Sequence, residues 1–501
     1  MQTIFAARLK QHAQSASGSQ AFAMPGYVLT YADLLCRVQA CAAWLVGEGL
    51  ARERPPGVVG ITIADDVTHM VASLALLWLG VPHVCLSSRD PVAKRLDVAE
   101  RLAVTRVVLA ESRHALPGKT TSLLTRERFD SPAAGEPTNP VVTDPDAPAL
   151  YYSSSGTTGE PKIFALSQRG LAWRAQSIAR SERIVDACDY RSLTLVAVED
   201  PMAKSRLVTC AYLGATSVLS GGLDSPALSP QALCESLDVS CLELTVLQVS
   251  GLVAGPADPR RFPERTTVYT AGARVPAGVR QAFRSRFGIP LWVHYGAREF
   301  GRISSTFPDG DGDPRIDGAA TESVGVPVSW IDLQIVDADG SAVAAGQPGE
   351  LRVRAECMPT GYHGDPAATS RHLRDGWFYP GDVVSLTPGG RLCLHGRSDD
   401  MMNLNGIKIF PAEIERVLEQ HPAVKAAAAF SKPSIAHGDI PVAAVELHCS
   451  STVGVDELLA HARERLGVRA PRKIIVLDAL PRNSAGKLVK RDLARLVAPA
   501  T

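Results

Sequence analysis

The stretch Tyr152-Ser153-Ser154-Ser155-Gly156-Thr157-Thr158-Gly159-Glu160-Pro161-Lys162 decides how the rest of the chain is interpreted. It follows the apolar run 147–151, which predicts a buried strand that ends in a loop. Serine and threonine hydroxyls donate hydrogen bonds, glycines let the backbone approach a ligand closely, and Lys162 supplies a point charge. A loop with these properties can wrap a triphosphate.

A flexible linker is the alternative, because loops rich in glycine, serine and threonine often serve only as linkers. That interpretation would be preferred if the stretch ended at Gly159. The ending Gly159-Glu160-Pro161-Lys162 behind a strand favours a phosphate-binding role instead. The loop is not a Walker A motif, because proline precedes the lysine and Ile163 follows it.

The length and composition of the chain limit its number of domains, its partners and its environment. A chain of 501 residues is too long for one compact core, so we expect two or more domains. Lysine plus arginine and aspartate plus glutamate both number 52, so no broad basic field favours nucleic acid as a partner. The 10 cysteines form no C-x-x-C pair, which favours reduced thiols in a reducing, cytoplasmic environment.

No segment has the pattern of a membrane anchor. The first fourteen residues contain basic side chains and lack the apolar stretch of a signal peptide. The most apolar run, 70–85, is interrupted by Gly80 and Pro82 and is too short to span a bilayer. We expect a buried helix followed by a buried strand there, and no membrane span.

Strand and helix patterns alternate through most of the chain, which predicts parallel sheets with helices on both faces. After about Val324 the pattern becomes that of half-exposed antiparallel strands. We therefore expect an α/β protein with a large N-terminal domain (1–396) of doubly wound parallel sheets plus a β-rich subdomain, followed by a small, mobile C-terminal α+β domain (397–501). The expected strands include 58–63, 84–86, 107–110, 194–198, 244–249 and 267–270, and the expected helices 30–49, 70–79, 90–102, 171–181 and 276–287.

A hairpin is predicted around Pro388-Gly389-Gly390, which lies between two strand-like segments, 383–386 and 391–394. This hairpin would bring Asp382 and Arg397 together. An acidic and a basic side chain from distant sequence positions would then share one site. A plain structural salt bridge is the alternative for this pair.

Six segments together resemble the adenylate-forming superfamily, which includes acyl- and aryl-CoA ligases, stand-alone adenylation domains and beetle luciferases. They occur in that family's order over nearly the whole chain. The first is the loop quoted above, and any one segment alone would be weak evidence. The others are Ala271-Gly272-Ala273-Arg274, Tyr295-Gly296-Ala297-Arg298-Glu299, Trp377-Phe378-Tyr379-Pro380-Gly381-Asp382, Gly396-Arg397-Ser398-Asp399-Asp400 and Pro481-Arg482-Asn483-Ser484-Ala485-Gly486-Lys487.

The resemblance implies roles for these residues. Lys162, Glu299 and Lys487 would be catalytic, with Glu299 and Thr158 at a magnesium ion and Asp399 as the pivot of a domain hinge. Asp382 would accept hydrogen bonds from both ribose hydroxyls. The implied nucleotide-binding residues are Ser154, Ser155, Gly156, Thr157, Thr158, Gly159, Lys162, Gly272, Ala273, Arg274, Tyr295, Gly296, Arg298, Asp382, Arg397 and Lys487.

The same resemblance places the acid pocket between the helix after Glu199 and the edge formed by Val293 and His294. Glu199 and Asp200 lie where amino-acid-activating relatives hold the substrate amine. For Asp200, capping of the helix that follows it is the alternative, and it is preferred over a contact with the substrate. We expect an aryl or modest-sized acyl acid, with an amino-bearing acid as the alternative.

The reaction implied by the resemblance is ATP- and Mg²⁺-dependent activation of a carboxylic acid to acyl-AMP, followed by transfer to a thiol. The acceptor is either CoA or the phosphopantetheine of an acyl carrier protein acting in trans. A luciferase-like oxygenase would share the fold and the first step.

Four residues depart from the family's usual pattern. Ile163 and Gln168 replace a glycine and a histidine near the phosphate loop, Arg298 replaces a threonine, and Asn403 stands where many CoA ligases carry lysine. A weakened, non-catalytic acyl or nucleotide binder would explain these departures. Retention of the distant Lys487 argues against it, since a mere binder has no use for that lysine.

Overall fold

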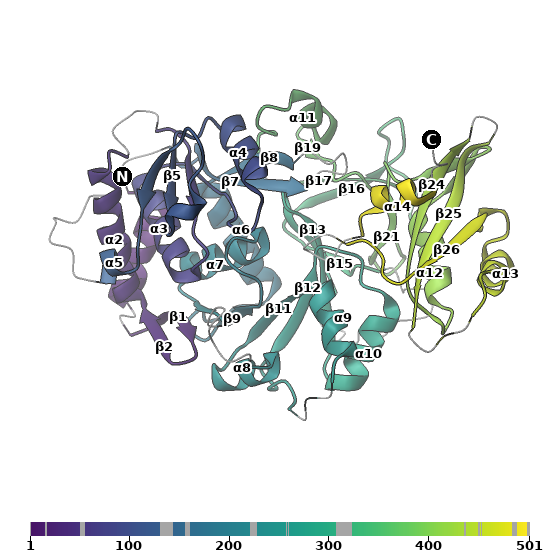
Figure 1. Cartoon of the computed structure of the whole chain (residues 1–501), viewed down its shortest axis with the longest axis horizontal. Coiled ribbons are helices and arrows are strands. Elements are labelled where there is room, and N and C mark those ends of the chain that lie inside the picture. Colours follow the sequence, from purple (N-terminus) through teal and green to yellow (C-terminus); the bar gives the residue numbers. More distant parts are fainter. Residues whose placement is uncertain are drawn as a thin grey trace.

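The computed structural model describes residues 2–15, 18–50, 56–130, 144–155, 161–220, 228–256, 258, 260–306, 323–434, 437–448, 451, 453–482 and 488–497. These residues form a large part built on two mainly parallel sheets, a β-rich region and a smaller C-terminal α+β unit (Figure 1). The expected α/β fold class is confirmed.

One six-stranded sheet carries the phosphate-loop candidate. Its order is β6-β5-β3-β4-β7-β8, in which β8 runs antiparallel to β7 and the other strands are parallel. Ser154 pairs with Lys162 in the β7–β8 ladder, so the candidate loop joins these two strands. The strands are β3 (Val59–Thr62), β4 (His83–Cys85), β5 (Arg106–Leu109), β6 (Thr120–Leu123), β7 (Pro148–Ser155) and β8 (Pro161–Ser167), with α4 (Val92–Arg101) between β4 and β5.

A second sheet of nine strands has the order β15-β14-β13-β12-β11-β9-β10-β1-β2, and its central strands are parallel. Its strands are β1 (Gln20–Met24), β2 (Tyr27–Thr30), β9 (Arg191–Thr194), β10 (Thr216–Val218), β11 (Cys241–Thr245), β12 (Thr267–Ala271), β13 (Leu291–Ala297), β14 (Gly301–Ser305) and β15 (Val326–Pro327). The helices α8 (Pro230–Ser236), α9 (Val246–Ala254) and α10 (Ala277–Phe287) alternate with the later strands.

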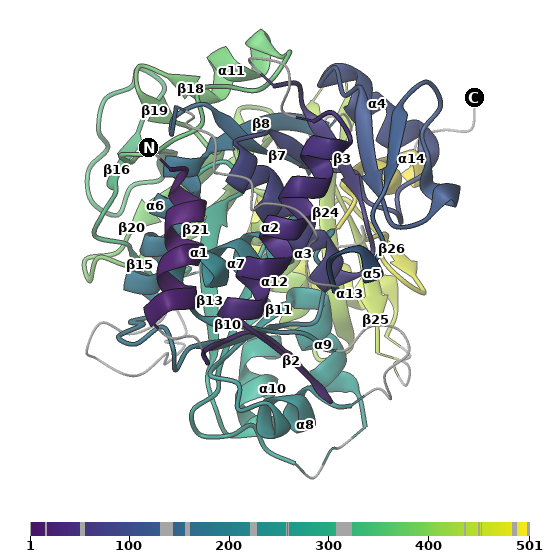
Figure 2. The same ribbon diagram turned by 90° about the vertical axis from the view of Figure 1, so that its left-hand side faces the viewer.

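Helices from early and middle parts of the chain share one hydrophobic core with strands of both sheets. They are α1 (Ile4–Ser15), α2 (Tyr31–Gly47), α3 (Asp66–Leu79), α6 (Gln168–Ser181) and α7 (Pro201–Leu213), and the short α5 (Glu127–Asp130) lies beside α2. Figure 2 views the molecule from the side on which α1 and α2 lie. Helix α3 is buried along almost its whole length, which explains why its sequence is so apolar.

The β-rich region contains β16 (Asp332–Val336), β17 (Gly349–Arg354), β18 (Leu373–Arg374), β19 (Trp377–Phe378), β20 (Asp382–Leu386) and β21 (Leu392–Arg397), with α11 (Pro366–His372) beside β18. The predicted hairpin is confirmed, because β20 and β21 are antiparallel partners. Asp382 and Arg397 lie directly opposite each other at its open end.

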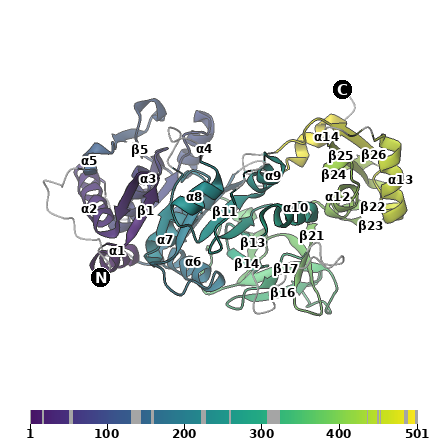
Figure 3. The ribbon, with the colours of Figure 1, turned by 90° about the horizontal axis from the view of Figure 1, so that it is seen from below.

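The C-terminal unit has its own hydrophobic clusters, formed within residues 402–493. It contains β22 (Met402–Leu404), β23 (Ile407–Ile409), α12 (Pro411–Glu419), β24 (Val424–Ser434), β25 (Gly438–Leu447), α13 (Val455–Leu466), β26 (Lys473–Leu477) and α14 (Lys490–Val497). These elements gather at the end of the molecule opposite the N-terminus (Figure 3). The exact domain boundary between residues 396 and 397 stays a prediction.

Two predicted strands were placed wrongly. Residues 195–198, expected within a strand, lie beyond the end of β9, and residues 246–249, expected in another strand, begin helix α9. Two helices also differ at their starts: α3 begins at Asp66 rather than at residue 70, and α6 at Gln168. Across the described part of the chain, no helix combines the length and apolar character needed to cross a membrane.

Candidate functional site

The first part of the candidate site is a cluster of Tyr295, Asp382 and Arg397. Tyr295, near the end of β13, donates its phenolic hydrogen bond to Asp382 Oδ2 at 2.5 Å. Arg397 Nη1 lies 3.4 Å from the other carboxylate oxygen. Burial, and then the neighbouring carboxylate, raise the pKa of Tyr295 well above its usual value, so it remains a donor.

Arg397 is fixed by further contacts around the same turn. Its Nη1 donates to the carbonyl of Pro380 at 2.5 Å, and its Nε lies 3.1 Å from Asp399 Oδ1. Gly381 has φ +80°, and a Cβ there would meet Arg397 Nη2 at 2.9 Å. The positive φ favours glycine at this position, and the guanidinium group of Arg397 approaches closely enough to crowd any Cβ there.

The second part of the site surrounds Lys162, the first described side chain after the candidate loop. Its Nζ donates to His372 Nε2 at 2.8 Å, at the end of α11. The other ring nitrogen of His372 lies 2.8 Å from the carbonyl of Tyr379 and must donate to it. This tautomer leaves Nε2 as an acceptor for Lys162, and burial lowers the pKa of His372, which keeps the ring neutral.

Glu299 is joined to Lys162 through Tyr362. The phenolic hydroxyl of Tyr362 donates to Glu299 Oε1 at 3.0 Å, and the ring centroid of Tyr362 lies 5.4 Å from Lys162 Nζ. The half-buried Arg174 donates a hydrogen bond to the backbone carbonyl of Glu299. Glu299 is thus positioned by a side chain and by its own backbone, close to the cation at the start of β8.

The two parts form one site. His372 is tied to Tyr379 and Arg397 to Pro380, so adjacent residues anchor both parts. Arg298 adds a third cation, whose Nη1 donates to the carbonyl of Ser153 on β7 at 3.1 Å. Gly296 precedes it on β13, where a Cβ would collide with the backbone of Gly301. The arrangement brings three cations, Lys162, Arg298 and Arg397, and two carboxylates, Glu299 and Asp382, together around the end of β7.

Arg274 contacts the C-terminal unit. It follows Gly272, whose φ of +89° makes the turn after β12, and Ala273. Arg274 Nη1 lies 2.8 Å from Glu419 Oε2 at the end of α12. In this arrangement the side chain links two parts of the molecule, and its predicted role beside the nucleotide stays a prediction.

The two acidic residues predicted for the acid pocket are engaged by the protein. Both carboxylate oxygens of Glu199 accept hydrogen bonds from Ser87 and Ser88, just beyond the end of β4. Asp200 caps α7 by accepting from the backbone N–H of Met202 at 2.8 Å. The capping alternative for Asp200 is therefore confirmed, while a role for either residue in binding the acid stays a prediction.

Val293 and His294 are buried inside the nine-stranded sheet region. Val293 packs in a hydrophobic cluster, and His294 stacks on Tyr269 with ring centroids 4.5 Å apart. His294 Nδ1 also lies 3.0 Å from Ser305 Oγ. Their predicted contact with the acid stays a prediction.

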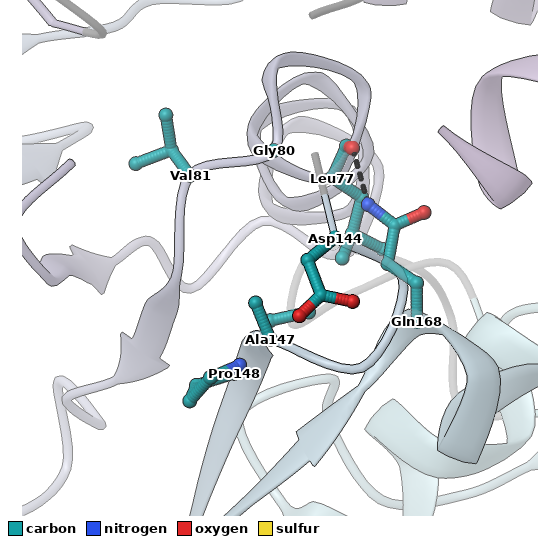
Figure 4. A pocket seen from close by; sticks show the side chains of 8 residues that line it. Leu77, Gly80, Val81, Asp144, Ala147, Pro148 and Gln168 are labelled. Carbon is teal, nitrogen blue, oxygen red and sulfur yellow. Dashed lines mark hydrogen bonds between the residues drawn. The ribbon is translucent and has the colours of Figure 1, made fainter. Parts of the chain in front are cut away.

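Two departures from the family's pattern have structural reasons. Ile163, on β8, is fully buried in a hydrophobic cluster. Gln168 ties two helices to the start of α6, because its Oε1 accepts from the N–H of Phe5 and its Nε2 donates to the carbonyl of Leu77 at 2.8 Å. Figure 4 shows this bond beside a small hollow whose lining includes Gln168.

Asn403 stabilises a turn. Its Oδ1 accepts from the backbone N–H of Gly406 at 2.8 Å, between β22 and β23. Asn405 and Gly406 both have positive φ there, as a tight hairpin turn requires. A local structural role therefore explains asparagine at a position where many CoA ligases carry lysine.

Several predicted site residues lie outside the described residues: Gly156, Thr157, Thr158, Gly159 and Lys487. Ser154 and Ser155 are placed as backbone in β7, without a description of their side chains. Sequence reasoning missed Tyr362, His372 and Arg174, which position Lys162 and Glu299. His372 ends α11, Arg174 lies in the middle of α6, and Tyr362 lies outside the named strands and helices, so no local sequence pattern marks these three residues.

Comparison with known proteins agrees with this geometry. The family model described as AMP-binding enzyme matches residues 9–363, and the one described as AMP-binding enzyme C-terminal domain matches residues 413–487. A 2-succinylbenzoate–CoA ligase from Geobacillus kaustophilus (strain HTA426) is 30% identical over 93% of this chain and 93% of its own length. A feruloyl-CoA synthase from Amycolatopsis sp is 28% identical, with 94% of each chain covered.

Solved structures show the same fold. The amide bond synthetase McbA from Marinactinospora thermotolerans superposes with a TM-score of 0.85 at 23% identity, covering 98% of this chain and 99% of that chain. The first matched range includes Lys162, Tyr295 and Glu299 of the candidate site, while Asp382 and Arg397 lie between the two matched ranges. The chain belongs to the AMP-binding enzymes.

Proposed function

We propose that this chain activates an aryl carboxylic acid with ATP to give acyl-AMP and then transfers the acyl group to the thiol of CoA. The observation that carries the proposal is the joined cluster of Lys162, Glu299, Asp382 and Arg397 at the open end of β7. The curated relatives named as CoA ligases match over nearly their whole length, which supports the thiol as acceptor.

The first half-reaction is a displacement at phosphorus. A carboxylate oxygen attacks the α-phosphorus of ATP, the bond to the bridging oxygen of the β-phosphate breaks, and pyrophosphate leaves. The protein contributes position and charge compensation in such a step. Lys162 and Arg298 would supply positive charge beside β7, while Asp382, oriented by Tyr295, would accept hydrogen bonds from the ribose hydroxyls.

Magnesium fits the residues present. In the described part of the chain no three acidic, histidine or cysteine side chains gather as a complete metal cage. A single carboxylate suits Mg²⁺ in such sites, because it keeps waters and takes phosphate oxygens as its remaining ligands. Glu299, held by Tyr362, would supply that carboxylate, and the ion would offset charge on the phosphates.

The second half-reaction transfers the acyl group. The thiolate sulfur attacks the carbonyl carbon, the bond to the phosphate oxygen of AMP breaks, and AMP leaves. A free carboxylate resists such an attack, which is why the acid must first acquire this leaving group. A carrier-protein phosphopantetheine carries the same thiol, so an acceptor comparison is part of the test.

The test is acid-dependent pyrophosphate release, measured across aryl, amino and fatty acids, with and without CoA. We expect release with aryl acids, thioester and AMP only when CoA is present, and loss of release when Mg²⁺ is chelated. Pyrophosphate release with no CoA thioester, combined with loading of a carrier protein, would contradict CoA as the acceptor. No release with any acid would contradict the whole proposal.

Asp399 provides a separate prediction about the hinge. Proline at this position would fix φ and remove the backbone donor, so Asp399→Pro should trap one orientation of the C-terminal unit. Adenylation, measured as hydroxamate formation, should survive better than thioester formation. Asp399→Ala is the matched control, because it also loses the contact with Arg397 but leaves the backbone free. Equal loss of both activities in the proline variant would place the hinge elsewhere.

A further inference from the structure

Lys204 is a buried lysine that has no role in the proposed mechanism. It lies in the first turn of α7 and is only 2% exposed. Within the part of the chain that the structure describes, its Nζ has no hydrogen-bond partner. Burying an amino group without a partner is costly, and the positive end of the helix dipole adds to that cost. Burial lowers the pKa of Lys204 to about 7.

The same helix shows what a structural cation looks like in this protein. Arg206, two residues further along, is also buried, but its guanidinium group contacts Glu182 at 3.0 Å and Glu243 at 3.0 Å. Arg302 also pairs with Glu182, at 2.7 Å, so two guanidinium groups meet two carboxylates. Among the described residues, the fold therefore supplies carboxylate partners for Arg206 and no hydrogen-bond partner for the Lys204 amino group.

Lys204 lies in the first turn of the helix that follows the parallel strand β9, on the side of the carboxyl ends of the strands, where ligands bind in α/β proteins. Its charge opposes the rise that burial causes in the pKa of Cys85, the last residue of β4, and adds to the fall that burial causes in the pKa of His69 in α3. Strand β4 is the direct neighbour of β7, which leads into the candidate phosphate loop. Adjacent strands are about 5 Å apart, so the end of β4 is one strand spacing from the strand that feeds the reaction site.

His69 complements Lys204 chemically. Its Nδ1 lies 2.9 Å from the carbonyl of Ile63 and donates to it, which makes Nε2 an acceptor. Among the described residues that Nε2 is buried without a donor. Burial, and then the charge of Lys204, lower the pKa of His69, which keeps the ring neutral. One buried donor and one buried acceptor thus lie within electrostatic range of each other.

A hydroxyl group satisfies both atoms at once, because it accepts one hydrogen bond and donates another. A carboxylate can only accept and leaves His69 unsatisfied. We propose that Lys204, together with His69, binds a hydroxyl group on the acid and makes the enzyme selective for hydroxylated aryl acids. This inference rests on the proposed function, whose acid it specifies.

The experiment uses matched acids that differ by one oxygen: 4-hydroxycinnamate with cinnamate, and 4-hydroxybenzoate with benzoate. For each acid, kcat/KM for pyrophosphate release is measured in the wild type and in Lys204→Met. We expect the wild type to prefer the hydroxylated member of at least one pair by tenfold or more. Lys204→Met should reduce that preference at least tenfold, since an orphaned hydrogen bond is strongly selected against. Lys94→Met, an exposed lysine paired with Asp90, should leave it unchanged.

A second readout separates recognition from a structural role. In the wild type the preference should titrate with a midpoint near pH 7, and in Lys204→Met that titration should vanish. The other titratable groups facing Lys204 are His69 on α3 and His83 and Cys85 on β4. Burial moves the pKa of His83 to about 3 and that of Cys85 to about 12, outside this window.

Two results would overturn the inference while leaving the proposed function intact. One is a wild type that releases pyrophosphate but shows no preference for the hydroxylated member of either pair. The other is an equal change for both members of a pair in Lys204→Met. Absence of pyrophosphate release from the wild type with every acid would instead count against the proposed function itself.

Discussion

Lys487→Ala is expected to lower acid-dependent pyrophosphate release by about 10²–10³-fold, the cost of losing one charge-stabilising donor in other enzymes. The expectation rests on sequence position, since Lys487 lies outside the described residues and ends the segment 481–487 that resembles the family's lysine loop. A group delivered only for adenylation stabilises the charge that develops between the α-phosphate and the attacking carboxylate. Supplied with synthetic acyl-AMP and CoA, the variant should still form thioester at nearly the wild-type rate.

A neighbouring lysine offers the control for this experiment. Lys490 lies three residues further along and pairs with Glu415 at 2.8 Å within the C-terminal unit. Lys490→Ala removes the same charge from the same part of the chain, so it should leave both half-reactions close to wild type. Full adenylation by Lys487→Ala, or equal loss of both half-reactions in a folded protein, would contradict the assignment.

Asp382→Ala is expected to raise the KM for ATP by about 100-fold. Each ribose hydroxyl left unpaired costs about 1–3 kcal/mol, and two hydroxyls lose their acceptor. Tyr295→Phe should have a smaller effect, about tenfold, because it removes only the bond that orients the carboxylate. Steady-state kinetics at varied ATP, with thermal unfolding measured in parallel, separates lost binding from lost fold.

The alternative role of Asp382 is a structural salt bridge with Arg397, and this alternative predicts a different result for Asp382→Ala. In that case Asp382→Ala would lower the unfolding temperature and leave the KM for ATP unchanged. Asp332→Ala is a control within the same sheet, because Asp332 forms an exposed pair with Arg354 at 2.8 Å. Exposed pairs contribute little, so neither quantity should change much in that variant.

The Asp382–Arg397 contact could be predicted from sequence because a hairpin is a local structure. The glycines and proline of the turn mark its position, and the two strands then bring their outer ends together. The capping of α2 by Thr30 was equally accessible, since the capping residue directly precedes an apolar helical pattern. Where the contacts that determine a structure join residues close in sequence, the local sequence pattern is sufficient to predict that structure.

Other features depend on contacts that no local pattern contains. Residues 195–198 are apolar enough for a strand, but the chain leaves the sheet there, and the N–H of Val198 donates to Asp66, which lies 132 positions away in sequence. His372 and Tyr362 reach Lys162 across 200 or more residues of chain. The start of α9 is different, because Thr245 and Gln248 form a capping box that the sequence already displayed.

On helix α7, one buried cation stabilises the fold and another selects the acid substrate. Arg206 locks the helix to Glu182 and Glu243, so its substitution would loosen the framework. Within the described structure the amino group of Lys204 has no hydrogen-bond partner. An apolar residue at position 204 should therefore be tolerated or should even stabilise the fold. Position 204 can therefore be varied to change which acid the enzyme accepts. The ion pairs of Arg206 should keep helix α7 in place in such variants.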